Sequence, residues 1–195
     1  MKKSSALLLI LVILISCKSP KKDKENTNEN VTAVLSFIQS QVAQLDTSLS
    51  PIKKIEQVDT LPADTIDISR NEIRALANDF LNIPDISQKQ YKDEYKESQN
   101  YDPDLGLVSL LTLPKTTSSA DIQKQEVLIK PDSEGGKIVT MYIDREWGNK
   151  DSSVTKKMIW QVDGYFQVLT LKQFPGQPET SHLLKVTWKD LTKSE

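Results

Sequence analysis

The chain contains one cysteine, Cys17, and one histidine, His182, and these two side chains limit the chemistry that the protein can perform. Zinc sites built on several histidines and most histidine-oriented triads need partners that this composition does not provide, and a Cys–His pair would have to use Cys17 itself. A single histidine at the start of a strand is usually structural. The sequence also contains no GxSxG, no glycine-rich phosphate loop and no HExxH. We therefore expect a protein that is not an enzyme and that holds no metal ion and no cofactor.

Two groups of carboxylates offer other chemistry. The first is Asp102-Pro103-Asp104, but a calcium loop needs more oxygen ligands and typically a glycine at its sharp turn. The second is the run 89–97, which mixes lysines, acids and tyrosines. Glycoside cleavage would require two carboxylates about 5–10 Å apart across a cleft. We interpret the first group as a turn and the second as the solvated face of a helix.

The position of Cys17 gives that side chain a different role. Two lysines precede an unbroken apolar run at residues 6–15, which has the length of the core of a secretory signal peptide. A membrane-spanning helix needs about 20 apolar residues. The block LISC, residues 14–17, resembles the bacterial lipobox. Over residues 1–17 this resemblance implies a diacylglycerol on Cys17, cleavage before Cys17 and acylation of the new N-terminus. The alternative is an uncleaved apolar anchor with an incidental cysteine.

The lipobox resemblance also predicts where the protein lies. Lys18 follows the cysteine, and in lipoproteins of Gram-negative bacteria a lysine there permits export to the outer membrane, on the periplasmic side or at the cell surface. The next residues are polar and mixed in charge, which predicts a disordered tether. We expect a signal peptide at 1–16, the lipidated cysteine and tether at 17–30, and one domain at 31–195.

Composition excludes one class of partner. The chain carries 25 Lys and Arg against 27 Asp and Glu, and two of those lysines precede the expected cleavage site. This balance leaves no basic surplus to neutralise phosphates, so we expect no nucleic-acid binding. Loss of Cys17 to a lipid leaves no thiol in the rest of the chain, which excludes a disulfide within it.

The first part of the domain shows a helical period. Apolar side chains recur at spacings of three and four over residues 31–45, which predicts an amphipathic helix. Residues 46–67 are rich in Pro, Thr, Ser and Asp, and we expect a long connection there with at most a brief strand near 52–58.

A second helix has a marked beginning. Ser69 and Glu72 have the spacing of a capping box, and Pro84 requires the helix to end by about residue 83. A third, more polar helix is expected over residues 87–98.

From residue 105 onward the period changes toward two, which is typical of strands. The DG dipeptide at 163–164 predicts a two-residue hairpin turn that places Val162 opposite Tyr165, with Trp160 and Phe166 on opposite faces. The remaining strand candidates are residues 107–113, 125–130, 137–147 and 182–189.

These elements predict an α+β fold, with two or three N-terminal helices packed on a C-terminal antiparallel meander sheet of four to five strands. The second face of the hairpin carries more apolar side chains than is usual for a face exposed to water. The N-terminal segments could cover it, the sheet could roll into a half-barrel, or the face could bind a ligand.

Aromatic residues are frequent on the expected sheet, and core packing with cross-strand pairing explains them. The alternative is a concave surface for a lipid, a glycan or a peptide. The possible ligand or partner face on this surface consists of Tyr142, Trp147, Trp160, Tyr165, Phe166 and Trp188.

The hairpin carries a second resemblance. Its IWQVD and FQV segments, residues 159–163 and 166–168, resemble a hairpin of Gram-negative envelope lipoproteins of unknown function, so no activity is implied. We expect a non-enzymatic lipoprotein, held at the outer membrane through Cys17, that binds an envelope protein or stabilises an assembly. The alternative is a binder or carrier of a small ligand that uses a concave antiparallel sheet.

Overall fold

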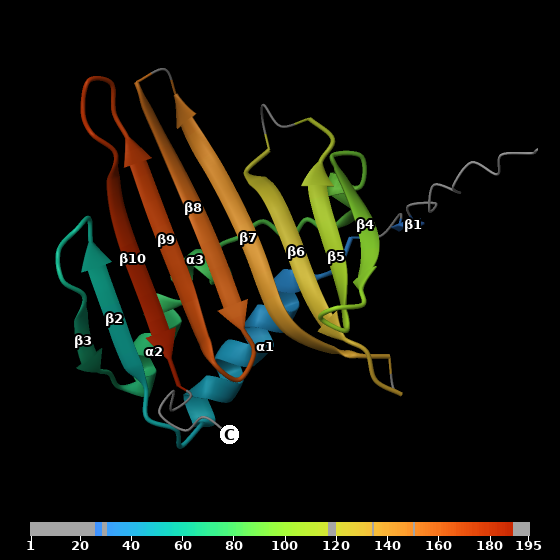
Figure 1. Cartoon of the computed structure of the whole chain (residues 1–195), viewed down its shortest axis with the longest axis horizontal. Coiled ribbons are helices and arrows are strands. Elements are labelled where there is room, and N and C mark those ends of the chain that lie inside the picture. The colour runs from blue at the N-terminus through green and yellow to red at the C-terminus, as the bar shows by residue number, and fades with distance from the viewer. Residues whose placement is uncertain (1–25, 29–30, 117–119, 134, 150, 189–195) are drawn as a thin grey trace, which may run out of the picture.

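The computed structural model describes residues 26–28, 31–116, 120–133, 135–149 and 151–188, and half of this backbone lies in one antiparallel sheet (Figure 1). The sheet order is β1-β4-β5-β6-β7-β8-β9-β10-β2-β3. The strands are β1 (Asn26–Asn28), β2 (Lys53–Val58), β3 (Asp64–Asp67), β4 (Tyr95–Asp102), β5 (Leu107–Pro114), β6 (Ile122–Lys130), β7 (Lys137–Asn149), β8 (Ser152–Gln161), β9 (Tyr165–Gln173) and β10 (Thr180–Thr187). The helices are α1 (Val34–Thr47), α2 (Arg70–Leu76), α3 (Asn78–Leu81) and the 3-10 turn η1 (Lys89–Tyr91).

Each strand from β4 to β10 pairs with the next one along the chain, so this part of the sheet is a meander. The β2–β3 hairpin then joins the free side of β10, which brings an early segment beside the last strand. In Figure 1, α1, α2 and α3 lie behind the sheet. We call the face that these helices cover the inner face, and the opposite one the outer face.

The predicted fold class is wrong, because the sheet dominates the structure. Ten strands form the sheet instead of four to five, and the helices are few and short. Helix α1 has 14 residues, whereas α2 and α3 have 7 and 4. The additional strands come from the N-terminal half of the chain. Strands β3 and β4 lie where a long connection and a third helix were expected, whereas β2 confirms the brief strand expected near residues 52–58. Residues 26–28, at the end of the expected tether, also form a short strand, β1.

The segment expected as the third helix, residues 87–98, contains the 3-10 turn η1 and, from Tyr95 onward, the first half of strand β4. Tyr95 and Glu97 are buried while Lys96 between them is exposed, which is the period of a strand. The Glu97 carboxylate accepts hydrogen bonds from the backbone N–H of Thr32 (2.8 Å) and the hydroxyl of Thr112 (3.1 Å). These two donors stabilise a buried acid on the inner face. A sequence pattern that treats every glutamate as solvent-exposed therefore misses the strand alternation in this segment.

The first two predicted helices are confirmed. Helix α1 begins at Val34, within the predicted range, and its buried side chains face the sheet. The capping box is formed before α2, where the Glu72 carboxylate accepts a hydrogen bond from the Ser69 N–H (2.8 Å). The second helix is interrupted near Ala77, so that α3 follows α2, and it ends before Pro84.

The β8–β9 hairpin forms, but its predicted register is wrong by one residue. Gln161, not Val162, lies opposite Tyr165, so the loop has three residues, 162–164. The N–H of Val162 bonds to the carbonyl of Val139 on β7 (3.0 Å), which removes Val162 from the hairpin ladder. Asp163 takes a φ of 57°, the left-handed conformation that a three-residue hairpin loop uses.

The observed register of β8 against β9 brings aromatic side chains together in the core. Trp160 and Phe166 now lie opposite each other on the inner face and stack, with ring centroids 5.2 Å apart. Phe80 of α3 meets both rings edge-on, at 5.2 Å and 5.7 Å, and Trp188 packs beside Trp160 at 5.8 Å. This aromatic cluster joins the short helices to the centre of the sheet.

Candidate functional site

The aromatic residues that the sequence named as one possible face lie in three different places. Strand side chains alternate, and the three-residue hairpin loop changes which residues share a face. Trp160, Phe166 and Trp188 belong to the inner core, Tyr142 and Tyr165 lie on the outer face, and Trp147 lies on the inner face near the end of β7. The structure therefore does not bring the six together, and Trp147 and the two tyrosines are the members available to a ligand or partner.

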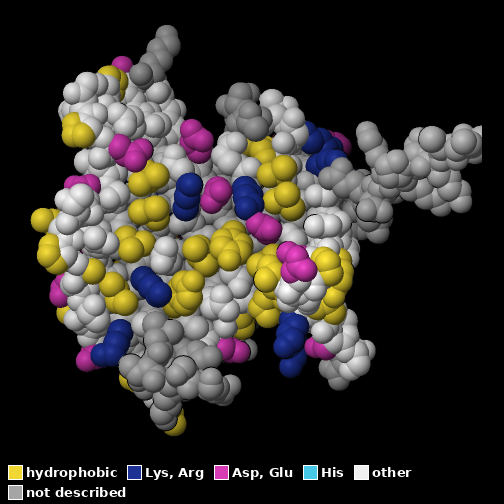
Figure 2. All heavy atoms as spheres, viewed as in Figure 1, with side chains coloured by type: hydrophobic (Ala, Val, Ile, Leu, Met, Phe, Trp, Pro, Cys, Tyr) yellow, Lys and Arg dark blue, Asp and Glu magenta, His cyan; other side chains and the backbone are white. Residues whose placement is uncertain are grey.

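The outer face is the first candidate surface. In the described part of the chain the helices lie on the other side of the sheet, so solvent reaches this face directly (Figure 1). Its side chains include Leu111, Leu128, Tyr142, Ile159, Leu169, Leu171, Tyr165, Leu183 and Ile55, all partly exposed. Figure 2 shows apolar side chains over the middle and the β9–β10 side of this face. We call this set the outer apolar face.

One row of charges crosses the outer apolar face. Lys124, Asp144 and Lys157 lie opposite one another on β6, β7 and β8, and basic and acidic side chains alternate on the surface in Figure 2. The ammonium of Lys124 also binds Glu126 at 2.7 Å and lies 5.9 Å from the centre of the Tyr142 ring. The row therefore divides the outer apolar face into two apolar parts.

Glu126 illustrates how these charges are held. Partial burial by itself raises the pKa of this carboxyl, but hydrogen bonds from Lys124 and from the Ser109 hydroxyl (2.8 Å) outweigh it and lower the pKa. On the far side of the face, the Lys185 ammonium lies 4.1 Å from the centre of the Tyr165 ring. Both half-buried tyrosines of this face are thus flanked by a lysine.

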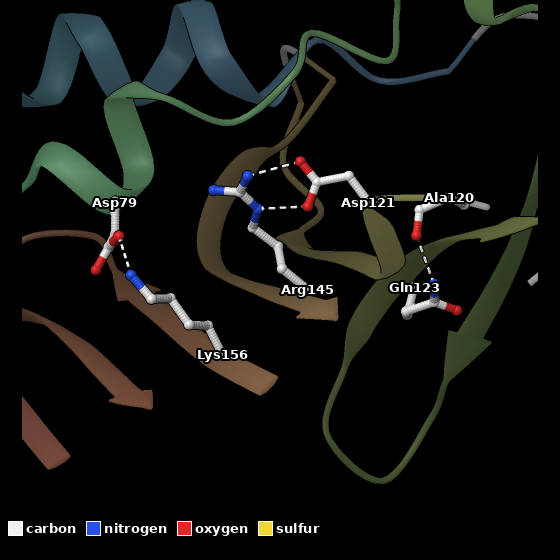
Figure 3. Close-up of polar contacts among 6 residues, drawn as sticks. All are labelled: Asp79, Ala120, Asp121, Gln123, Arg145 and Lys156. Atoms are coloured by element: carbon white, nitrogen blue, oxygen red, sulfur yellow. Dashed lines mark hydrogen bonds and ion pairs between the residues drawn. The ribbon is translucent and has the colours of Figure 1, made fainter. Parts of the chain in front are cut away.

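The second candidate surface lies on the inner face, where β7 and β8 extend past α3. Trp147 is 41 % exposed there. The guanidinium of Arg145 makes two hydrogen bonds to Asp121, of 2.9 Å and 2.6 Å, and the ammonium of Lys156 binds Asp79 of α3 (Figure 3). These ion pairs fasten α3 and the segment before β6 to the sheet.

His182 lies at the β10–β2 side of the inner face. Its Nε2 is 2.7 Å from a carboxylate oxygen of Glu56, and the other oxygen of Glu56 is 2.9 Å from the Lys54 ammonium. The hydrogen bond from Lys54, and then the one from His182, lowers the pKa of Glu56. The hydrogen bond to Glu56 raises the pKa of Lys54. The recorded partner of the imidazole is a carboxylate, so the described residues supply it with no nucleophile to activate.

The other predicted features of the polar residues can be placed as well. Asp102 accepts hydrogen bonds from the N–H groups of Asp104 (2.9 Å) and Leu105 (3.0 Å), which confirms the turn. Within the described ranges, no group of three or more His, Cys, Asp or Glu side chains has the arrangement of a metal site. None of the helices described is long and apolar enough to span a bilayer. Cys17 and the rest of the lipobox lie outside the described residues.

Two open clefts lie beside α1 at the β8–β9 turn, and Asp163 borders both. The larger, of about 490 Å3, is lined mainly by Phe37, Ile138, Val139 and Val162. The smaller, of about 370 Å3, is lined mainly by polar residues of α1 and of the connection after it. Both lie at the rim of the helix layer, while aromatic side chains fill the space between α3 and the sheet.

Sequence reasoning missed the charged row and the ion pairs around Trp147. Lys124, Asp144 and Lys157 are far apart in the sequence, and only the strand register brings them together. Alternation within 137–147 was a usable signal, because it placed Trp147 on the same side as Met141. Comparison of the chain with protein-family models, with curated proteins and with solved structures finds no match in any of the three.

Proposed function

We propose that the protein is a lipid-anchored, non-enzymatic module of the cell envelope that holds a protein partner on its outer apolar face. The observation that carries the proposal is the apolar side of the sheet that none of the described helices covers. An antiparallel sheet with one face in water normally alternates apolar side chains inward with polar ones outward. Here leucine, isoleucine and tyrosine also point outward from strands β5 to β10 and from β2.

The dimensions of this face suit a protein better than a small molecule. Apolar side chains reach from Leu111 on β5 to Ile55 on β2, and from Leu171 to Tyr165 along β9. With strands about 4.8 Å apart and about 3.3 Å per residue, the face measures roughly 30 Å by 20 Å. Each partner in a standard protein interface contributes about 800 Å2, an area of the same order. Small ligands of drug size are more commonly bound in concave sites that enclose most of their surface.

The charges on the face indicate the chemistry of the partner. Lys124 and Lys157 flank Asp144 in the central row, and Lys185 adds a further cation beside Tyr165. With Glu126 bonded to Lys124, these three lysines accompany two carboxylates, Asp144 and Glu126, so the charges on this part of the face carry a small excess of lysine. A partner with an apolar surface that is interrupted by acidic residues would match this pattern.

The proposed anchor places the module at the membrane. The lipobox resemblance of residues 14–17 supports attachment through Cys17, and Lys18 supports the outer membrane. Three acyl chains hold a protein far longer than one, since a single chain binds only marginally. The chemistry of the described residues supports a binding role, because their polar groups are arranged as ion pairs and turns and not as a nucleophile with its base.

A pair of matched leucine substitutions tests the proposal on the full chain. Leu169→Lys places a charge in the outer apolar face, and Leu61→Lys makes the same change at a leucine of the β2–β3 turn that is 61 % exposed. The protein is extracted from its own cells in mild detergent and its size is measured by gel filtration. We expect the wild type and Leu61→Lys to elute in a complex, and Leu169→Lys to elute mainly as the lone chain.

Two outcomes would contradict the proposal. If Leu169→Lys elutes like the wild type, the outer apolar face does not hold the partner. If the purified chain alone reaches the size of the complex, the partner is a second copy and not another protein. A thermal melt of each variant controls for unfolding, and Ile159→Gln is a milder change on the same face if Leu169→Lys proves unstable.

A further inference from the structure

One aromatic side chain of the inner face, Trp147, lies where the helices no longer cover the sheet. Its register partner on β8 is Val154, and α3 reaches only as far as Lys156, two residues further along that strand. Trp160 on the same face is completely buried, whereas Trp147 is 41 % exposed. The indole of Trp147 therefore presents an apolar surface to solvent at the edge of the helix layer.

Two cations lie over the Trp147 ring, where each makes a cation–π contact with part of the indole, and both are held in place. The centre of the Arg145 guanidinium is 5.2 Å from the ring centre, and the Lys156 ammonium is 5.8 Å from it. Asp121 holds the first through two hydrogen bonds, and Asp79 holds the second (Figure 3). Because partners on other elements fix each cation, these polar groups are preorganised and lose little freedom when a ligand binds.

We infer that this group, the Trp147 platform (Trp147, Arg145, Lys156, Asp79 and Asp121), binds an uncharged saccharide ring. A pyranose has an apolar face of C–H groups, which can pack flat on an indole, and a rim of hydroxyls that need both donors and acceptors. The carboxylates of Asp121 and Asp79, 40 % and 31 % exposed, supply acceptors, and the less exposed Arg145 and Lys156 side chains, 14 % and 17 %, supply the N–H groups that their ion pairs leave over.

Charge balance selects a neutral ligand. The two cations and the two carboxylates of the Trp147 platform cancel, so these four groups give the platform no net charge, and Lys172, opposite Val154, is an additional cation on this face. The ion pairs also fasten α3 and the segment before β6 to the sheet, but fastening does not require an exposed indole beside them. The platform lies on the inner face, so this inference is independent of the protein partner proposed for the outer apolar face.

A glycan array followed by fluorescence titration tests the inference. The full chain, in mild detergent, is screened against neutral, N-acetylated and acidic oligosaccharides, and the hits are titrated while tryptophan emission is followed. The chain has three tryptophans, of which Trp160 and Trp188 are buried, so a ligand at the platform should change mainly the emission of Trp147. We expect binding of neutral oligosaccharides, and a loss of affinity of about tenfold or more in Trp147→Ala.

Phe174 provides the matched control. It is also 41 % exposed, but it belongs to the β9–β10 connection, so Phe174→Ala should leave the affinity unchanged. Trp147→Phe should retain part of the affinity, because a smaller ring still offers a flat face. The inference is overturned if no neutral oligosaccharide binds the wild type, if Trp147→Ala binds as tightly as the wild type, or if only acidic sugars bind and salt abolishes their binding.

Discussion

Trp160 on β8 and Phe166 on β9 stack across the hairpin, with ring centroids 5.2 Å apart and planes only 15° from parallel. The pair lies on the inner face, and Phe80 of the short helix α3 closes it from above, with its ring 82° from the plane of Trp160. A helix of 4 residues has little stability of its own. We conclude that this aromatic contact, and not helix propensity, holds α3 on the sheet.

Phe80→Ala should therefore destabilise the protein strongly. Removal of a fully buried phenylalanine ring costs about 3–5 kcal/mol, because it leaves a cavity against Trp160 and Phe166. Urea unfolding followed by tryptophan fluorescence measures this change. Phe174→Ala removes an exposed ring and should change the free energy of unfolding by less than about 0.5 kcal/mol. Equal effects of the two substitutions would show that α3 contributes nothing to the core.

The β8–β9 loop gives a second prediction, which depends on the backbone of Asp163. Its φ of 57° is tolerated by Asp and Asn but not by a β-branched residue. Asp163→Val should lower the free energy of unfolding by about 1–2 kcal/mol, whereas Asp163→Asn should leave it nearly unchanged. Chemical denaturation of the two variants checks this. If the two variants are equally stable, the loop does not hold the three-residue conformation described here.

The same loop shows how far periodicity alone can go. Alternation located each strand from β5 to β10, because apolar side chains recur every second residue in those segments. It could not give the register of β8 against β9, since the hydrogen bond of Val162 to Val139 comes from a third strand. A slip of one residue moves every side chain of a strand to the other face. Trp160 and Phe166 were therefore predicted on opposite faces, and one binding face was assembled from residues that do not meet.

Strand β2 was expected as a brief strand near residues 52–58, but β3 and β4 were missed for other reasons. Strand β3 is short, polar and exposed throughout, so it carries no alternation to detect. Strand β4 buries Glu97, whose two hydrogen-bond donors come from residues distant in the sequence. The Trp147 platform depends in the same way on ion pairs between β7, β8, α3 and the segment before β6. Contacts of this kind depend on the tertiary structure, and single-sequence patterns do not contain them.

Arg145 gives a third prediction, on the rigidity of that platform. A guanidinium matches the carboxylate of Asp121 with two hydrogen bonds, and an ammonium offers only a point charge. Arg145→Lys should therefore destabilise the protein by about 1 kcal/mol and loosen the segment before β6. The backbone N–H of Glu146 bonds to the carbonyl of Asp121 (3.2 Å), so its hydrogen exchange should become faster. Unchanged exchange at Glu146 would mean that the ion pair does not hold this segment.

The fourth prediction concerns the membrane. Cys17→Ala removes the proposed site of lipid attachment and leaves the rest of the sequence intact. The wild-type chain should sediment with membranes and resist carbonate extraction, and the variant should be released. Ser16→Gly keeps a small residue before the cysteine and serves as a control that should still sediment. A Cys17→Ala protein that remains in the membrane after carbonate treatment would contradict the lipid anchor.

The fifth prediction is a pH dependence that arises from Glu56. Hydrogen bonds from Lys54 and His182 lower the pKa of this carboxyl in the folded protein. A carboxyl whose pKa is lower in the folded state binds fewer protons there than in the unfolded chain. It therefore contributes stability above its unfolded pKa of about 4.3, and this contribution is lost as the pH falls through the folded pKa. The wild type should lose stability below about pH 5.

Glu56→Gln removes the titrating group, so the variant should lose less stability than the wild type over the same range of pH. Urea unfolding at intervals from about pH 7 to pH 3 measures the difference. Glu179→Gln, at an exposed residue just before β10, removes the same charge without these contacts, and its pH profile should parallel that of the wild type. If Glu56→Gln also followed the wild-type profile, the hydrogen bonds from Lys54 and His182 would have no effect on the pH dependence of stability. The Glu56 carboxyl would then titrate alike in the folded and the unfolded protein.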